Sequence, residues 1–144
     1  MKGFDYSKVK EEEELYDKLR PLGHKIINKC YKVNYIGVEN IPSEGGFIIA
    51  SNHIRALDPL YIALGVEKRQ IYFMGKQELF SKPIIGTLFK KANGFPVVRG
   101  RGDKDAVDYA IRVVKEGHIL GIFPVAMSAV MLMVCVERIN EIKK

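Results

Sequence analysis

Four short, almost wholly apolar runs, separated by stretches of helix length, constrain the fold of this chain most strongly. Apolar runs of four to six residues bounded by turn-forming residues are typical of buried strands. Strands that alternate with helices favour an α/β domain. We therefore expect a mixed, mostly parallel sheet flanked by helices. The runs are residues 47–50, 71–74, 95–98 and 118–123.

The stretches between these runs carry signals for helix starts and stops. Asp58 stands at a cap position before Pro59 and predicts a helix through about Gly65. A second helix is expected over residues 84–91, and a third from Asp103 to Glu116, where Gly117 ends it.

The two ends of the chain predict further helices around this α/β unit. Apolar residues recur every three or four positions over residues 15–33, with Pro21 as a break or kink and lysines on the other faces. This amphipathic helix either packs on the domain or lies on an anionic bilayer. A short strand is expected over residues 35–38. We divide the chain into an N-terminal helical segment (1–32), an α/β domain (33–124) and a C-terminal helix (125–144).

The apolar run over residues 125–136 is too short to span a membrane, which takes roughly 18 to 20 apolar residues. It either completes the core or dips into a bilayer. The first residues have no apolar stretch, so we expect no signal peptide.

The formal net charge of +6 suits a nucleic acid, an anionic membrane surface or a phosphorylated substrate. The chain has no dense Lys/Arg tract, and its aromatic residues do not alternate with basic ones as a stacking platform requires, which argues against nucleic acid. Its two cysteines, Cys30 and Cys135, lie far apart and predict neither a disulfide framework nor a metal site, as expected of a reducing, cytoplasmic compartment. No metal and no cofactor are expected.

Polar residues follow the apolar runs at the positions where ligand sites form in open α/β sheets. His53, Lys76 and Arg99 each come just after an expected strand, and so does Pro124. If the strands pair in parallel, these segments meet at one edge of the sheet.

His53 and Asp58, five positions apart, are the candidate catalytic pair. Histidine is the usual general base near neutral pH, and a carboxylate on its other nitrogen orients the ring. Two simpler interpretations stay open: His53 as an ordinary loop histidine, and Asp58 as a helix cap.

The segment SNHIRALDP, which contains this pair, resembles the first signature block of the glycerolipid acyltransferases, the family that includes the 1-acylglycerol-3-phosphate acyltransferases. FMGKQELF resembles the segment that follows the first block in that family, and GFPVVRGRGD resembles its second signature block. The order and the spacing of these segments are also similar. The resemblance covers roughly residues 33–124.

The resemblance implies transfer of a fatty acyl group from acyl-CoA or acyl-carrier protein to lysophosphatidate, which forms phosphatidate in phospholipid synthesis. It implies His53 as the base and Asp58 as its orienting acid. Arg99, with Arg101 and Lys76 as helpers, suits the phosphate, because a guanidinium matches phosphate oxygens in pairs. Asn52 completes the expected substrate-binding set. The enzyme is expected to be peripheral on the inner face of the cell membrane.

The third block of the family departs from the pattern. GIFP is present at residues 121–124, but Val125, Ala126, Met127 and Ser128 replace the glutamate, glycine, threonine and arginine that follow it in the family. The family also continues through further strands and a fourth block. The alternative is therefore a weak or inactive acyltransferase-like remnant that binds membrane or lipid phosphate, and a thioester hydrolase is a third possibility.

Overall fold

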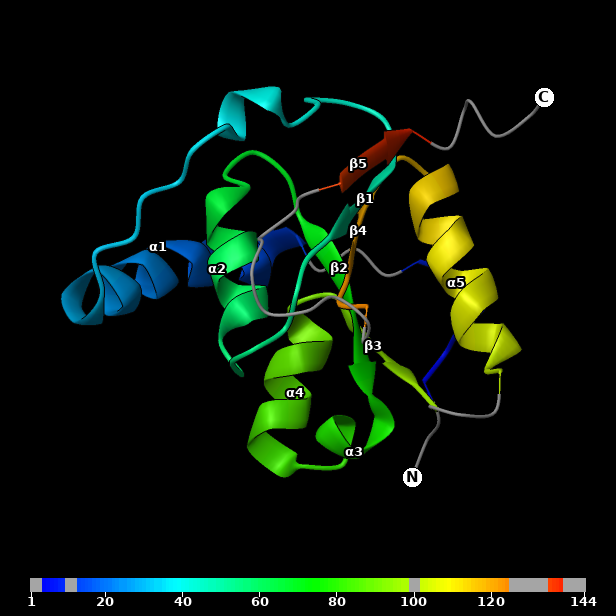
Figure 1. The fold of residues 1–144 in the computed structure, drawn as a ribbon. Helices are drawn as coiled ribbons and strands as arrows, with labels where there is room; N and C mark the ends of the chain where they lie inside the picture. The colour runs from blue at the N-terminus through cyan, green and yellow to red at the C-terminus, as the bar shows by residue number, and fades with distance from the viewer. Residues whose placement is uncertain (1–3, 10–12, 99–101, 125–134, 139–144) are drawn as a thin grey trace.

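A computed structural model describes residues 4–9, 13–98, 102–124 and 135–138 of the chain. Its centre is a five-stranded sheet in the order β3-β2-β4-β1-β5 (Figure 1). The first four strands in the chain run parallel, as expected, and β5 is antiparallel to β1. The strands are β1 (Phe47–Ala50), β2 (Ile71–Lys76), β3 (Gly94–Val97), β4 (Ile119–Ile122) and β5 (Cys135–Arg138).

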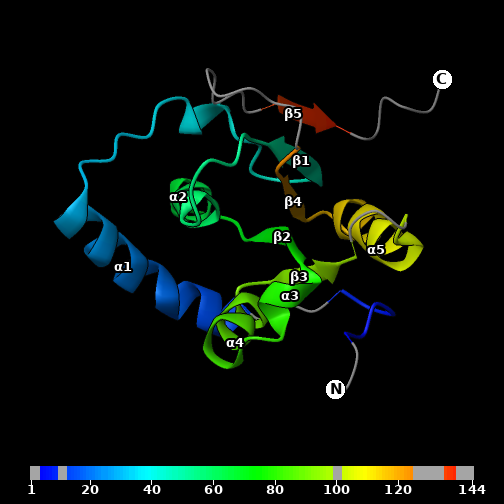
Figure 2. The ribbon, with the colours of Figure 1, turned by 60° about the horizontal axis from the view of Figure 1, so that its bottom comes forward.

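Helices cover both faces of this sheet. Helix α5 lies on one face and α2 on the other, with α1 on the outer side of α2 (Figure 2). The helices are α1 (Glu13–Cys30), α2 (Asp58–Gly65), α3 (Gln77–Phe80), α4 (Pro83–Lys91) and α5 (Lys104–Lys115), with a 3-10 turn η1 (Val38–Asn40). No helix in the described part of the chain has the length and apolar character to cross a bilayer.

The alternation of side chains along the strands divides the core in two. Residues Tyr72 and Leu120 pack with Tyr109 and Val113 of α5 on one face. On the other face Phe73 and Ile119, one position away on the same strands, pack with Ile62 of α2 and with Val66, which follows it. Every second residue of a strand therefore faces α2, and this decides which side chains can reach that helix.

The predicted strands and helices of the central domain agree with the structure to within about two residues, and two predictions around α1 need correction. Of the break or kink expected at Pro21, the break does not form, because α1 continues through this residue. The expected strand over residues 35–38 does not form, because Gly37 turns the chain with a left-handed φ of 82° and leads into η1. The short helix α3 was not predicted.

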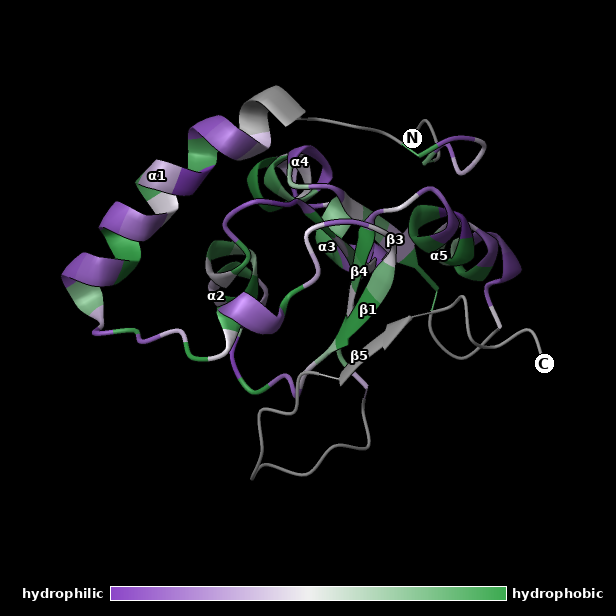
Figure 3. Cartoon of the chain, turned by 90° about the horizontal axis from the view of Figure 1, so that it is seen from above, coloured by the Kyte–Doolittle hydropathy of each residue, from purple (hydrophilic) through white to green (hydrophobic). Residues whose placement is uncertain are grey.

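Helix α1 packs on the domain through one face. Tyr16 and Ile27 are buried, whereas Leu22 and Ile26 are 52% and 53% exposed. Figure 3 shows hydrophilic and hydrophobic residues side by side on α1, in contrast to the mainly hydrophobic strands β1 and β4. Helix α1 thus packs on the domain, as one of the two interpretations predicted, and still exposes apolar side chains.

The C-terminal helix expected over residues 125–144 is wrong where the structure describes this segment. Cys135–Arg138 form strand β5, with Ala50 opposite Cys135 and Phe47 opposite Arg138. Strand β1 would otherwise leave a row of backbone N–H and C=O groups without partners at the sheet edge. The rest of the predicted helix lies outside the described residues.

Candidate active site

The candidate site begins where β1 ends. Ser51 continues the pairing of β1 beyond the strand, because its N–H donates to the carbonyl of Ile122 at 3.1 Å. Ser51 and Asn52 are buried, and the Ser51 hydroxyl donates to the Asn52 carbonyl at 3.1 Å. The chain therefore enters the next loop from a fixed position, and His53 is the first exposed residue of that loop.

Asp58 reaches back over this loop and holds His53. One carboxylate oxygen, Oδ2, lies 3.1 Å from His53 Nδ1. The same oxygen accepts hydrogen bonds from the backbone N–H groups of Ile54 at 2.6 Å and Arg55 at 2.7 Å. The side chains of His53 and Asp58 are 42% and 21% exposed. The predicted pair is thus in contact and open to a substrate.

The environment of Asp58 favours its charged form. Burial raises the pKa of the carboxyl, but the hydrogen bonds from Arg55, His53 and Ile54 lower it, and the pKa lies below its ordinary value of 3.8. An ionised carboxylate only accepts hydrogen bonds, so the proton between the two side chains belongs to Nδ1 of His53. This leaves Nε2 of the neutral ring as its basic nitrogen.

Asp58 does not cap helix α2 as the sequence predicted. The N-cap position is Leu57, which has helical backbone angles, and no side chain caps the helix. The carboxylate binds N–H groups of residues that precede it in the chain, and not those of the first turn. The simpler interpretation of Asp58 as a helix cap is therefore wrong.

An aromatic ring supports the imidazole from a different strand. The ring centroids of His53 and Phe123 lie 4.6 Å apart with an interplanar angle of 34°. Phe123 follows β4 and stacks on Phe73 of β2, with centroids 5.8 Å apart and an angle of 14°. Phe123 was not among the predicted site residues, although its spacing of four from Ile119 along one strand indicates that both residues share a face.

The remaining predicted site residues lie at different distances from this pair. Asn52 precedes His53 and lines the cavity described below. Lys76 is exposed at the end of β2, at the same sheet edge, and strand alternation puts it with Tyr72 and Met74 on the face that α5 covers. Arg99 and Arg101 lie outside the described residues.

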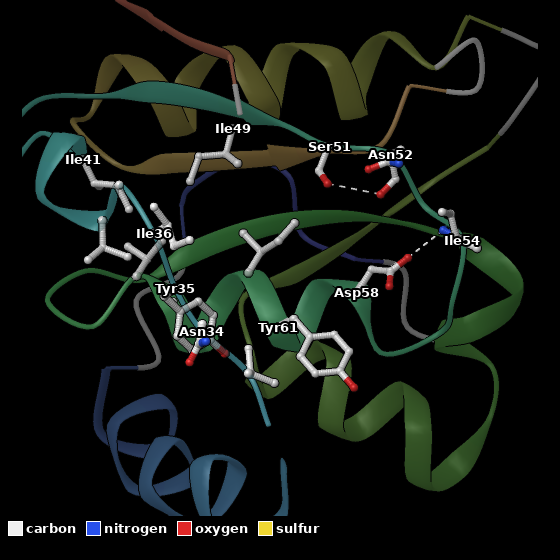
Figure 4. Close-up of a pocket in the computed structure, with 16 residues that line it drawn as sticks. Asn34, Tyr35, Ile36, Ile41, Ile49, Ser51, Asn52, Ile54, Asp58 and Tyr61 are labelled. Carbon is white, nitrogen blue, oxygen red and sulfur yellow. Dashed lines mark hydrogen bonds between the residues drawn. The ribbon is translucent and has the colours of Figure 1, made fainter. Parts of the chain in front are cut away.

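A largely apolar cavity of about 480 Å³ begins at Asp58 and runs along α2. Figure 4 shows Asp58 and Asn52 toward one end, with Asn34 and Tyr35 toward the other. The cavity is bounded by α2, β1 and the segment that contains η1. Its lining includes Ile36, Val38, Ile41, Ile49, Ile62 and Val66.

A second apolar cavity of about 370 Å³ lies on the other side of α2, between α1, α2 and α4. It reaches Leu57, in the loop between His53 and Asp58, and Phe73 beneath Phe123. Three of its lining residues, Leu22, Ile26 and Leu88, are about half exposed, so this cavity is open to the surface. The two cavities put apolar space on both sides of the His53–Asp58 loop.

The described residues contain no group of three or more histidine, cysteine or acidic side chains that could bind a metal ion.

Comparison with known proteins shows the family. Residues 32–127 match the Acyltransferase family, and this chain belongs to that family.

Three of the relatives that it matches carry the same name. The chain is similar to a 1-acyl-sn-glycerol-3-phosphate acyltransferase of Bacillus subtilis, with 37% identity over 102 residues, 71% of this chain and 47% of that protein. A protein of the same name from Streptococcus pneumoniae is 31% identical over 84 residues, 58% of this chain and 32% of the relative. Another from Borreliella burgdorferi is 33% identical over 96 residues, 65% of this chain and 38% of the relative. The chain thus covers less than half the length of these relatives. No solved structure matches it.

Proposed function

We propose that this protein transfers a fatty acyl group from a thioester donor, acyl-CoA or acyl-carrier protein, to the free hydroxyl of 1-acylglycerol-3-phosphate and so forms phosphatidate. The observation that carries the proposal is the contact between His53 Nδ1 and Asp58 Oδ2, which leaves Nε2 as a base on an exposed ring. Membership of the Acyltransferase family and the names of the relatives support this reaction class.

The reaction follows from the chemistry of the pair. Nε2 of His53 takes the proton of the acceptor hydroxyl while the oxygen attacks the thioester carbonyl carbon. The C–S bond then breaks, and the departing thiolate takes the proton back from the imidazolium. Asp58, ionised and hydrogen-bonded to Nδ1–H, steadies the positive charge that the ring carries between the two steps.

The phosphate of the acceptor needs cations near this site. We assign it to Arg99, with Arg101, Lys76 and Asn52 in support, because the loop after β3 starts at the edge where His53 stands. Arg99→Ala is expected to raise KM for lysophosphatidate by about 10- to 100-fold, since a hydrogen bond to a charged group contributes roughly 1.5–3 kcal/mol. Arg101→Ala and Lys76→Ala should have smaller effects. An unchanged KM in Arg99→Ala would remove this assignment.

We assign the transferred acyl chain to the 480 Å³ cavity beside Asp58, whose volume lies in the range of small-molecule sites. Ile62→Phe narrows this cavity and should shift the enzyme toward shorter acyl donors. Leu60→Phe is the matched control, because Leu60 lies two residues away on α2 and lines the other cavity. Equal chain-length profiles in both variants would argue against the assignment.

The open apolar surface of the second cavity is our candidate contact with an anionic membrane. Leu22 and Ile26 of α1 and Leu88 of α4 are half exposed there, and Lys90 and Lys91 end α4 close by. Exposed apolar side chains among lysines suit an anionic lipid surface. We expect flotation with phosphatidylglycerol vesicles that weakens with salt, and a loss of flotation in Leu22→Ser/Ile26→Ser. Binding that is insensitive to both changes would contradict this surface.

A turnover assay separates this function from its alternatives. Purified protein is incubated with lysophosphatidate and a long-chain acyl-CoA, and free thiol and phosphatidate are followed together. Thiol release that needs lysophosphatidate and is lost in His53→Ala supports acyl transfer, whereas release without acceptor supports a hydrolase. Release no higher than in His53→Ala would instead support the lipid-binding remnant, which the apolar residues Val125 to Met127 favour.

A further inference from the structure

His53 has one hydrogen-bonding partner on its ring among the described contacts, and a single bond does not fix the plane of an imidazole. Nδ1 lies 3.1 Å from Asp58 Oδ2, and the ring can still rotate about this contact. The His53 side chain is 42% exposed, and water does not hold the ring in one orientation. Something else must hold the plane of the ring if Nε2 is to keep one direction.

Phe123 supplies the second contact. Its ring lies 4.6 Å from the imidazole, centroid to centroid, at an angle of 34°. Offset and tilted aromatic pairs with centroids 4.5–7 Å apart are favourable. The flat face of Phe123 thus restrains the plane that the hydrogen bond to Asp58 leaves free.

Phe123 itself rests on Phe73. The two rings are nearly parallel, at 14° and 5.8 Å, and Phe73 is buried in β2. Phe123 follows the last residue of β4 and is packed against the core cluster on the α2 face of the sheet. The height of Phe73 above the sheet therefore sets the height of Phe123.

Gly121 allows Phe73 to lie low on the sheet. Gly121 is the direct partner of Phe73 in the pairing of β2 with β4. A Cβ atom at position 121 would lie 2.3 Å from Cε1 and 2.5 Å from Cδ1 of Phe73, and 3.0 Å from Cγ2 of Ile71. The two distances to Phe73 are shorter than real Cβ contacts, so any side chain at this position would displace the Phe73 ring.

We propose that Phe123 is a positioning residue for His53, and that Gly121 and Phe73 set the height at which it meets the imidazole. The proposal rests on the proposed function in one respect, namely that His53 acts as the base. The contact series runs from Gly121 of β4 through Phe73 of β2 and Phe123 to His53, which follows β1.

The experiment uses Phe123→Leu, Phe123→Tyr and Phe73→Leu in the full chain. Leucine keeps apolar bulk at position 123 but has no flat face, whereas tyrosine keeps the ring. We expect kcat for acyl transfer to fall by about 10- to 100-fold in Phe123→Leu with KM nearly unchanged, because small displacements of a reacting group cost this much. Phe123→Tyr should recover most of kcat, and Phe73→Leu should behave like a milder Phe123→Leu.

A second measurement does not depend on turnover. Nitrogen-15 NMR of the histidine rings reports whether the His53 ring keeps one orientation. We expect one sharp set of His53 ring signals in the wild type and in Phe123→Tyr, and exchange-averaged ring signals in Phe123→Leu and Phe73→Leu. Absence of acyl transfer in the wild type would overturn the proposed function, while the ring signals would still test the positioning role.

Phe95→Leu is the matched control for loss of an aromatic ring. Phe95 is fully buried on the α5 face and packs on Tyr109 at 4.8 Å, so the substitution also removes an aromatic pair from the core. It should lower stability and leave the His53 signals unchanged. Wild-type signals and wild-type kcat in both Phe123→Leu and Phe73→Leu would overturn the proposal, and so would averaging of the His53 signals in Phe95→Leu.

Discussion

Asp58 and Asp103 look equivalent in the sequence, but only Asp103 binds the first turn of its own helix in the structure. Each follows a parallel strand at the same edge of the sheet and stands at the start of a helix. Asp103 Oδ1 accepts the N–H of Ala106, in the first turn of α5, and Oδ2 accepts the N–H of Val98 at the end of β3. Asp58 accepts only from residues that precede it.

The backbone conformation at the N-cap position of each helix explains the difference. Asp103 has an extended conformation, with φ −62° and ψ 91°, and this directs a cap side chain at the N–H groups of the first turn. At α2 the chain is already helical at Leu57, with φ −90° and ψ −3°, so Asp58 lies inside the helix. Its carboxylate is then free to bind the loop behind it. One aspartate stabilises a helix, and the other orders a histidine.

The largest expected effect is a loss of activity in Asp58→Asn that Asp103→Asn does not show. Asp58→Asn removes the charge that stabilises the imidazolium, and its amide can donate to Nδ1 and favour the wrong tautomer. We expect kcat for phosphatidate formation to fall by about 10²- to 10⁴-fold, the usual contribution of a positioned acid–base group. Asp103→Asn is the matched control, because asparagine caps helices as well as aspartate does.

Asp103→Asn should change kcat by less than about threefold, since it leaves the His53 loop intact. Similar losses of kcat in both asparagine variants would mean that the two aspartates do not differ in role.

A smaller effect is expected on stability, and here Asp103 contributes more than Asp58. Asp103→Ala should lower the free energy of unfolding by about 1–2 kcal/mol, because the first turn of α5 and the end of β3 both lose a hydrogen-bond acceptor. Asp58→Ala should cost less than about 1 kcal/mol, since the N–H groups of Ile54 and Arg55 can turn to water. Urea unfolding followed by circular dichroism measures both values. A larger loss in Asp58→Ala than in Asp103→Ala would break the contrast.

The smallest expected effect is a pH dependence at Asp58. Its pKa in the folded protein lies below 3.8, so the ionised form contributes stability above that value, and the contribution is lost as the pH falls through the lower folded pKa. The wild type should therefore lose more stability than Asp58→Asn on acidification from about pH 6 to about pH 3. Parallel losses in the two proteins would show that folding does not favour the charged carboxylate.

The sequence predicted the central fold well because its signals are local. Runs such as residues 47–50 are apolar throughout, and Gly117 marks the end of a helix, so both elements follow from a few neighbouring residues. The strand expected over residues 35–38 fails because its pattern also suits a turn, and Gly37 takes a left-handed conformation there. The C-terminal helix prediction is wrong at residues 135–138, because a continuous apolar run fits a buried helix and a strand equally well. The segment forms a strand because the open edge of β1 offers hydrogen-bonding partners.

The candidate site was predictable where its residues are close in the sequence. His53 and Asp58 are only five positions apart, and the structure joins them as expected. Phe123 was not identified, because its contact with His53 depends on β4 lying next to β1, a pairing between strands that are separated by more than 60 residues. The cavities on both sides of α2 depend in the same way on where α1 and η1 pack.

By itself the sequence determined the alternation of strands and helices, the histidine and the aspartate that meet, and the position of this pair after a strand. These depend on hydrophobic periodicity and on short loops, which act over a few residues. The tertiary structure decided that Asp58 turns toward His53 and not toward its own helix, that the tail adds a strand to β1, and that Phe123 comes to rest on the imidazole. These features depend on which strands become neighbours and on the fit of side chains such as Phe73 over Gly121. Close packing determines that fit only after the sheet has formed.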